Sequence, residues 1–417
     1  MKKRKNSTHL LPVLAFALIA AILICAAILV FPNLFSKKEP VEKPAVSSDT
    51  ILGRMIASGE EVSGVYVATV GNLNYPSSRG LSGDQLKAEL DDIVATCSKA
   101  SINTIIFQVR PMCDALYYSD LFPSSAYLSG TQGVRPEVDV LAELVLRAHA
   151  NNIAVAAWVN PLRVIKGDLD SLAPDNPAAV HRDWCVEYGG TYYFDAGIPE
   201  VRKLVSDGCA EIAAGYDVDA ILFDDYFYPY PKDGEEFDDD ETFAKFGGGE
   251  SIADWRRGNV NKMIAECHTA VKAANEDCLF GIAPFGIWSN DNGKNGGSAT
   301  RGLDAYNDIY CDALAWVKDG SVDFLAPQLY WSFSTAAAPY NVVCDWWAQA
   351  LKGTGVVLMS SNAAYRITEW EDPDELEKQV AYTRQNGEYA GVLYYSYAVF
   401  KDNVNDVVSC VARINAD

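Results

Sequence analysis

Two adjacent carboxylates, Asp224 and Asp225, are the residues of this 417-residue sequence best suited to chemistry. They close the apolar run DAILFDD, and Tyr226, Tyr228 and Tyr230 follow directly. Two acids this close repel when both are ionised, so that one keeps its proton to a higher pH while the other stays charged. Hydrolysis of a glycosidic bond needs such a protonated donor beside a charged partner. An ordinary acidic pair would cap a loop or bind an arginine, but a place at the end of an apolar strand, among aromatic residues, favours catalysis.

Aromatic and planar polar residues recur where other apolar runs end. Sugar rings stack on aromatic side chains through their apolar faces, and planar polar groups hold their hydroxyls. The candidate substrate-binding residues are Arg110, Asp114, Trp158, Asn160, Arg163, Tyr226, Tyr228, Trp288, Gln328, Tyr330, Trp331 and Tyr365, and the pattern extends to Tyr395 and Tyr397. Each residue alone fits core packing, but their recurrence at strand ends predicts one shared site.

Eight short, β-rich apolar runs alternate with longer segments of helical period, which is typical of a parallel sheet covered by helices. The runs begin at residues 64, 104, 153, 219, 279, 322, 355 and 390, and the candidate helices cover 84–100, 137–151, 199–215, 254–275, 303–318, 340–352, 373–386 and 402–415. Eight such units predict an α/β fold, a (β/α)8 TIM barrel. The alternative, an open doubly wound sheet, usually carries a Gly-rich phosphate turn after its first strand, where this chain reads VGNLNYPSSRG. The long insertions follow strands two to five, and a barrel places them on the face that carries active sites.

The N-terminus predicts a single transmembrane helix ahead of the barrel. Four basic residues within the first five precede an uncharged apolar run over 10–35, which is long enough to cross a bilayer. We expect residues 1–35 to be a cytoplasmic basic tip and an uncleaved signal anchor, 36–63 a flexible stalk, and 64–417 an extracytoplasmic catalytic domain. A cleaved signal peptide is the alternative, whereas Ile24 before Cys25 disfavours lipidation.

The formal net charge of −22 makes nucleic acid an unexpected partner and disfavours a polyanionic substrate unless the cleft carries local Arg or Lys. The acidic loop GEEFDDDE lacks the ligand order of helix-loop-helix calcium sites, so we expect it to be solvated. Arg256 and Arg257, in WRRGN, are expected to form surface or inter-loop ion pairs. Most of the ten cysteines fall in predicted helices and are expected to be free thiols. The four histidines are scattered, so the sequence predicts no metal and no cofactor.

The segments GVYVATVGNLNYPS, QVRPMCDALYYSDLFPSSAYLSGTQG, AWVNPLRV, DAGIPEVRKLV, YDVDAILFDDYFYPY, DWRRGNVN, FGIAPFGIW and APQLYW, running to AAYR, occur in order between residues 64 and 400. With them the chain resembles the glycosyl-hydrolase-10-like family of bacterial barrels. The resemblance implies a barrel fold, export, anchoring and activity on cell-wall glycans, with peptide-free peptidoglycan strands as a substrate class. It maps the family's acidic pair onto Asp224 and Asp225. The sequence departs from the family at Cys113, where a Gly is usual, and at LDAYNDIY after a shortened fifth loop.

The catalytic mechanism has two readings. Strand seven ends in MSSNAAYR, without the second carboxylate that retaining barrels often place there. An adjacent acidic pair resembles enzymes in which the substrate's own 2-acetamido group is the nucleophile; here Asp224 would orient the acetamide and Asp225 would be the general acid, or the reverse, with Tyr330 and Asn160 as hydrogen-bond donors. In the second reading Asp225 is the acid and Asp114 the base of an inverting attack by water.

Two other function classes compete with a glycosidase that cleaves N-acetylhexosamine linkages. One is a catalytically inactive barrel that binds cell-wall glycan as an anchor or scaffold. The other is a metal-dependent deacetylase or amidase, which needs His and Asp ligands at strand ends, where this sequence has no His.

Overall fold

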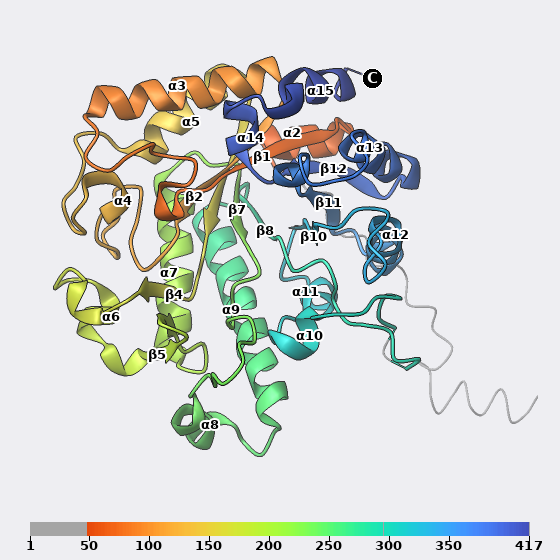
Figure 1. Ribbon diagram of the computed structural model, residues 1–417. Helices are drawn as coiled ribbons and strands as arrows, with labels where there is room; N and C mark the ends of the chain where they lie inside the picture. The colour runs from red at the N-terminus through yellow and green to blue at the C-terminus, as the bar shows by residue number, and fades with distance from the viewer. Residues whose placement is uncertain (1–47, 295, 417) are drawn as a thin grey trace, which may run out of the picture. The chain divides into compact units, whose positions relative to one another are not determined.

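The computed structural model describes residues 48–294 and 296–416, and they form a closed parallel barrel wrapped by helices (Figure 1). Its strands are β1 (Val62–Val67), β2 (Thr104–Arg110), β3 (Ala154–Val159), β7 (Ala220–Phe223), β8 (Leu279–Ile282), β9 (Phe324–Leu325), β10 (Gln328–Leu329), β11 (Val357–Asn362) and β12 (Tyr389–Tyr394). β9 and β10 are two halves of one barrel position, interrupted at Ala326 and Pro327, and both pair with β11, which closes the barrel. The predicted eight-stranded barrel is confirmed.

The alternation of side chains along each strand decides which residues reach the barrel mouth. Ala220 and Leu222 of β7 belong to the apolar cluster inside the barrel, whereas Ile221 and Phe223 belong to the cluster between strands and helices. Side chains of a strand alternate between faces, so Asp224 continues the inward series one step beyond the strand. The sequence alone did not fix this parity.

Helices cover the outside of the strands (Figure 1). The main ones are α3 (Gly83–Lys99), α5 (Val140–Ala150), α7 (Pro199–Gly215), α9 (Ile252–Ala274), α11 (Ala313–Asp319), α12 (Tyr340–Leu351), α13 (Glu375–Asn386) and α15 (Val407–Ile414). The helix predicted over 303–318 is wrong as one unit, because it divides into α10 (Ala305–Asp308) and α11. Asp312 separates the two and caps α11, accepting from the backbone N–H of Ala315 at 3.3 Å. The last predicted helix, over 402–415, begins only at Val407, after α14 (Tyr397–Lys401).

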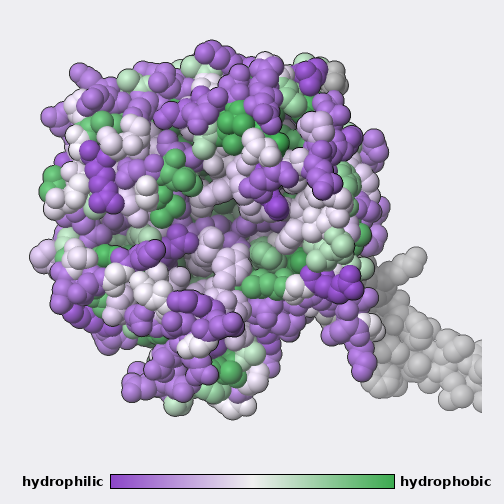
Figure 2. Space-filling model, in the orientation of Figure 1, coloured by the Kyte–Doolittle hydropathy of each residue, from purple (hydrophilic) through white to green (hydrophobic). Residues whose placement is uncertain are grey.

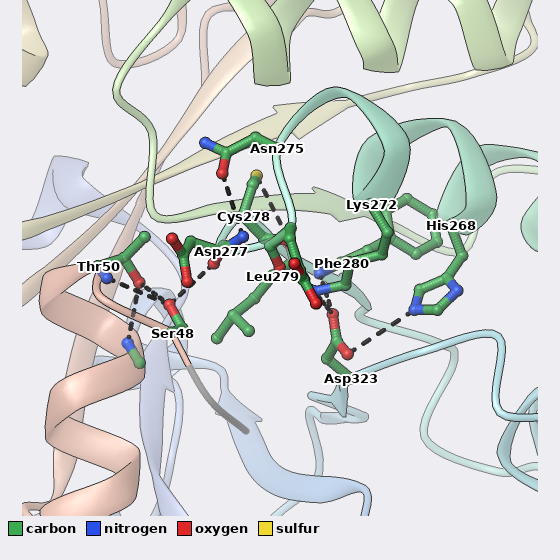
Figure 3. A network of polar contacts seen from close by, with 12 residues as sticks. Ser48, Thr50, His268, Lys272, Asn275, Asp277, Cys278, Leu279, Phe280 and Asp323 are labelled. Atoms are coloured by element: carbon green, nitrogen blue, oxygen red, sulfur yellow. Dashed lines mark hydrogen bonds and ion pairs between the residues drawn. The ribbon is translucent and has the colours of Figure 1, made fainter. Parts of the chain in front are cut away.

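The predicted stalk is wrong in its last part, because the chain is already folded from residue 48. Helix α2 (Ile51–Ser58) buries Ile51, Leu52 and Met55 against the inner apolar cluster, and the backbone N–H of Leu52 donates to the Asp219 carboxylate at 3.0 Å. The composition of the predicted stalk, whose start is rich in Pro, Lys and Glu, hid this helix from the sequence analysis. The buried face of α2 extends over only one helical turn. Figure 3 shows the nearby contacts, among them the Ser48 hydroxyl donating to the carbonyl of Asp277 at 2.8 Å.

The predicted anchor and the first part of the stalk lie outside the described residues. Within residues 48–294 and 296–416, none of the helices combines the length and the hydrophobicity needed to span a bilayer. The surface in Figure 2 is mostly hydrophilic with small separate apolar patches.

The loop after β3 forms a small antiparallel sheet in the order β4 (Arg163–Lys166), β6 (Thr191–Phe194), β5 (Cys185–Tyr188). The loop after β7 carries α8 (Asp240–Phe246). Asp239 of this loop is buried and accepts from Arg256 Nε at 2.9 Å, so the inter-loop ion pair is confirmed for Arg256, whereas the expectation of a solvated loop is wrong at Asp239. All nine cysteines in the described part of the chain are free thiols.

Candidate active site

Asp224 is held at the barrel mouth by a chain of hydrogen bonds that begins in the backbone. The backbone N–H of Thr69 donates to Gln108 Oε1 at 2.8 Å, and Gln108 Nε2 donates to Asn160 Oδ1 at 2.6 Å. Asn160 Nδ2 in turn donates to Asp224 Oδ2, and Trp158 Nε1 donates to the same oxygen at 3.1 Å. Gln108 belongs to β2, whereas Trp158 and Asn160 both stand at the C-terminal end of β3, so two neighbouring barrel strands hold the carboxylate in one orientation.

Asp225 has a separate set of partners. The Tyr230 hydroxyl donates to Asp225 Oδ2, and Gln328 Nε2 donates to Oδ1 at 2.9 Å. Gln328 Nε2 also donates to the carbonyl of Ala283 at 2.9 Å. Asp225 is 1% exposed and is not among the residues that line the cavity described next, so its carboxylate supports the wall and does not open into the site.

A cavity of about 270 Å³ opens beside Asp224. Its lining consists of Tyr66, Trp158, Asp224, Tyr226, Tyr230, Ala283, Phe285, Gln328, Tyr330, Tyr365 and Tyr395. The lining residues come from β1, β3 and β10 and from the loops after β7, β8, β10, β11 and β12, so they converge from around the barrel mouth. Aromatic rings with polar edges around one acid form a wall suited to sugar rings.

Burial dominates the electrostatics of the acidic pair. It raises the pKa of Asp224 to about 7, with the charge of Asp225 adding to the shift and Arg163, Asn160 and Trp158 opposing it. Burial also raises the pKa of Asp225, opposed by the hydrogen bonds from Tyr230 and Gln328. A carboxyl group with a pKa near 7 can carry a proton at neutral pH and release it, which is what a general acid must do.

The structure brings five of the twelve predicted substrate-binding residues to the cavity wall. Those that line it are Trp158, Tyr226, Gln328, Tyr330 and Tyr365, and Asn160 is bonded directly to Asp224. Arg163 lies at the rim, with its guanidinium carbon 4.5 Å from the centre of the Tyr226 ring.

Arg110 and Asp114 lie outside this wall. Arg110 is 2% exposed and stacks over Phe122, 4.0 Å from the ring centre, against the glycine face of Gly208 on α7. The side chain of Arg110 therefore points out of the barrel toward α7, and the pairing of β2 with β3 shifts register between Gln108 and Arg110. Asp114 is buried in the loop after β2 and accepts from Gln132 Nε2 at 3.1 Å, and burial raises its pKa to about 6. Neither residue lines the cavity, so the structure does not bring them to the shared site that the sequence predicted.

Tyr228 and Trp288 are also placed elsewhere. Tyr228 is 2% exposed and packs against Phe237 and Tyr310. Trp288 stacks on Trp346, with ring centres 5.6 Å apart, and lines a separate hollow of about 480 Å³ near α11. Both expectations are wrong for the cavity beside Asp224, because each ring has its own packing partners.

Four cavity residues were missing from the predicted set, namely Tyr66, Tyr230, Ala283 and Phe285, whereas Tyr395 belongs to the predicted pattern. Tyr230 and Tyr395 stand in segments that the sequence marks as aromatic, and the inward parity of β1 would have identified Tyr66. Phe285 lines the cavity in place of Trp331, which packs edge-on behind it with ring centres 5.5 Å apart.

No group of three or more His, Cys, Asp or Glu side chains in the described ranges lies close enough together to hold a metal ion. The groups that the described residues bring to the site are one acid, the side-chain amides and the aromatic rings.

A (β/α)8 barrel with a protonatable carboxylate in an aromatic cavity at the carboxyl ends of its strands is the architecture of glycoside hydrolases. The family model described as "Glycosyl hydrolase-like 10" matches residues 61–379. The chain belongs to this family and is a glycosyl hydrolase by class.

Two curated relatives carry names of that class. The chain is 38% identical over 349 residues to glycosyl hydrolase YngK of Bacillus subtilis, an alignment that covers 81% of this chain and 68% of the relative. It is 35% identical over 366 residues to glycosyl hydrolase DigH of Escherichia coli K12, covering 81% of this chain and 83% of that protein.

Solved structures share the fold at low sequence identity. The PgaB (BpsB) glycoside hydrolase domain from Bordetella bronchiseptica aligns with a TM-score of 0.55 and 15% identity over 84% of this chain and 97% of that one. An endo-1,4-β-D-mannanase from Thermotoga petrophila aligns with a TM-score of 0.51 and 12% identity over 81% and 87%.

Proposed function

We propose that this protein hydrolyses N-acetylhexosamine linkages in a cell-wall polysaccharide, with peptide-free peptidoglycan strands as its substrate. The observation that carries the proposal is Asp224, a buried carboxyl with a pKa of about 7 that points into a cavity lined by aromatic rings. The family supplies the reaction class, hydrolysis of a glycosidic bond.

Asp224 is the general acid of this proposal. Trp158 and Asn160 both donate to Oδ2, whereas Oδ1 has only a 3.4 Å contact with the backbone N–H of Tyr226. Oδ1 is therefore the oxygen that carries the proton in the neutral acid. From the cavity wall it protonates the glycosidic oxygen as the bond to the anomeric carbon breaks.

This assignment reverses the order preferred from sequence, in which Asp225 was the acid. Asp225 does not line the cavity, and its two oxygens are occupied by Tyr230 and Gln328. It acts as a positioning residue, since it orients two side chains of the cavity wall and its charge raises the pKa of Asp224.

The nucleophile of this proposal is the substrate's 2-acetamido group. Asp224 is the one carboxylate among the cavity-lining residues of the described chain, whereas retaining and inverting pairs both need a second carboxylate facing the sugar. Asp114, the base of the inverting alternative, is buried outside the cavity. An acetamide oxygen that attacks the anomeric carbon supplies the missing nucleophile, and water then opens the cyclic intermediate.

Residues 1–35 complete the proposal as a membrane anchor that holds the barrel outside the cytoplasm. Its support is the basic cluster before the long apolar run, which orients such a helix with its N-terminus inside. The substrate of an anchored enzyme of this kind is the cell wall that surrounds the membrane.

Digestion of peptide-free peptidoglycan strands by the fragment from residue 48 onward tests the function. We expect new reducing ends and short saccharides in mass spectra. We expect strands from which the N-acetyl groups have been removed chemically to resist cleavage, because they lack the 2-acetamido nucleophile. Equal cleavage of de-N-acetylated strands would rule out the acetamide mechanism. Strands that bind but stay intact would support a glycan-binding barrel without turnover.

A further inference from the structure

We propose that Arg163 forms an anion subsite at the rim of the active-site cavity, where its guanidinium binds a free carboxylate on the sugar chain. The inference rests on the proposed function and adds a specificity to it. In peptide-free strands this carboxylate is the lactyl ether group of the muramic acid residue, which a stem peptide otherwise converts into a neutral amide.

The position of Arg163 follows from the small sheet after β3. Arg163 is the first residue of β4 and pairs in register with Tyr193 of β6, which anchors its backbone above the barrel mouth. Its guanidinium carbon lies 4.5 Å from the centre of the Tyr226 ring, and Tyr226 lines the cavity. A carboxylate on a sugar bound against these rings therefore lies within reach of the guanidinium.

The guanidinium has no hydrogen-bonded or ion-paired partner among the described residues. Two other arginines have carboxylate partners, since Arg256 binds Asp239 and Arg147 binds Asp91 and Glu143, whereas buried Arg110 also lacks one. Arg163 is only half-buried, and its guanidinium lies over the ring of Tyr226. An unpaired guanidinium with one stacked face presents a fork that matches a carboxylate.

The charge of the whole chain makes this cation necessary for an acidic substrate. A net charge of −22 repels a polyanionic glycan. The guanidinium of Arg163 offsets this repulsion at the rim of the cavity, so the sugar that carries the carboxylate is positioned relative to Asp224. A neutral homopolymer of N-acetylglucosamine gains nothing from this contact.

The same charge acts on the general acid. Arg163 opposes the rise in the pKa of Asp224 that burial causes. The other titratable groups facing Asp224 are Asp225 and the hydroxyls of Tyr66, Tyr226, Tyr230 and Tyr395, whose pKa values burial raises, so these hydroxyls are neutral. A bound carboxylate neutralises Arg163 and lets the pKa of Asp224 rise further. The correct substrate thus helps to keep the acid protonated.

Binding measurements with two matched ligands test the subsite. The ligands are a peptide-free peptidoglycan tetrasaccharide with free lactyl carboxylates and the same tetrasaccharide with these groups converted to methylamides. Calorimetry on the Asp224→Asn variant, which is expected to cleave them far more slowly than the wild type, gives both affinities. We expect the free acid to bind about 10-fold to 100-fold more tightly, the range for one charge-assisted pair.

Adding Arg163→Gln is expected to bring the affinity for the free acid down to that for the methylamide. The matched control is Arg135→Gln, because Arg135 also stacks on a tyrosine, 4.6 Å from the ring centre of Tyr118, but Tyr118, unlike Tyr226, does not line the cavity. The control should keep the preference.

Equal affinities for the two ligands, or a preference that survives Arg163→Gln, would overturn the subsite. Turnover by the wild-type chain is read separately, so an enzyme that cleaves both ligands equally retains the proposed function and loses this inference. A chain that binds neither ligand contradicts both.

Discussion

Replacing Trp158 by Phe removes one of the two strong donors to Asp224 and should move the alkaline limb of the pH profile upward. The indole N–H lies 3.1 Å from Asp224 Oδ2 and stabilises the ionised carboxylate. A hydrogen bond to a charged group is worth about 1.5–3 kcal/mol, and part of this remains when the acid is neutral. A loss of about 1.4 kcal/mol from the ionised form corresponds to a rise of about one pKa unit.

The sign follows from the role of the acid. Activity requires protonated Asp224, so kcat/KM falls as the pH rises through its pKa, which is about 7 in the free protein. In Trp158→Phe the fall of kcat/KM should occur at a pH about one unit higher. The assay is the initial rate of reducing-end formation on peptide-free strands at subsaturating concentration, across the pH range.

Trp316→Phe is the matched control. Trp316 is likewise buried, although it does not line the cavity, and its Nε1 donates to Asn261 at 2.7 Å. Both variants lose ring volume and one hydrogen bond, so both should be less stable, but only Trp158→Phe should shift the limb. An unmoved limb in Trp158→Phe, or an equal shift in both variants, would refute the assignment of the limb to Asp224.

The remaining predictions concern the stability of the barrel. His149 donates to buried Asp219 at 2.9 Å, and this hydrogen bond raises the pKa of His149. The contribution of this bond to the free energy of unfolding is fully present below the pKa of His149 in the unfolded chain, about 6.5. It is lost as the pH rises through the higher pKa of the folded protein. Urea unfolding of His149→Gln should show a flatter loss of stability across that window than wild type, and parallel curves would contradict this. Arg256→Gln leaves the carboxylate of Asp239 buried without its ion-pair partner and should lower the free energy of unfolding by about 3–5 kcal/mol, whereas an unchanged urea midpoint would refute this role.

The sequence predicted the barrel because its strands are short, apolar and separated by long helical segments. All eight predicted runs became barrel strands, since two-sided burial in a parallel sheet leaves a strong apolar signal. The sequence failed at α2, where the stabilising contacts are with Asp219, about 170 positions later in the chain. Contacts between such distant positions do not appear in a local pattern.

The site was predicted in part for a related reason. Residue type and strand end identified Asp224, Trp158 and Gln328, but the direction of each side chain depends on strand parity and bulges. Arg110 follows a register shift and turns toward α7, whereas Tyr66 lies inside a strand and turns toward the mouth. Chemistry-bearing residue types are therefore visible in the sequence, while their convergence is a property of the closed barrel.

The role of Asp224 is tested most directly by comparing two leaving groups in the Asp224→Asn variant. On peptide-free strands, where the leaving sugar hydroxyl needs a proton, we predict that kcat/KM falls about 100-fold to 10,000-fold. On the 2,4-dinitrophenyl glycoside of an N-acetylglucosamine oligosaccharide, whose leaving group departs without a proton, the loss should be less than about 10-fold. Equal losses on both substrates, or full activity on the strands, would contradict the account of Asp224 as the proton donor.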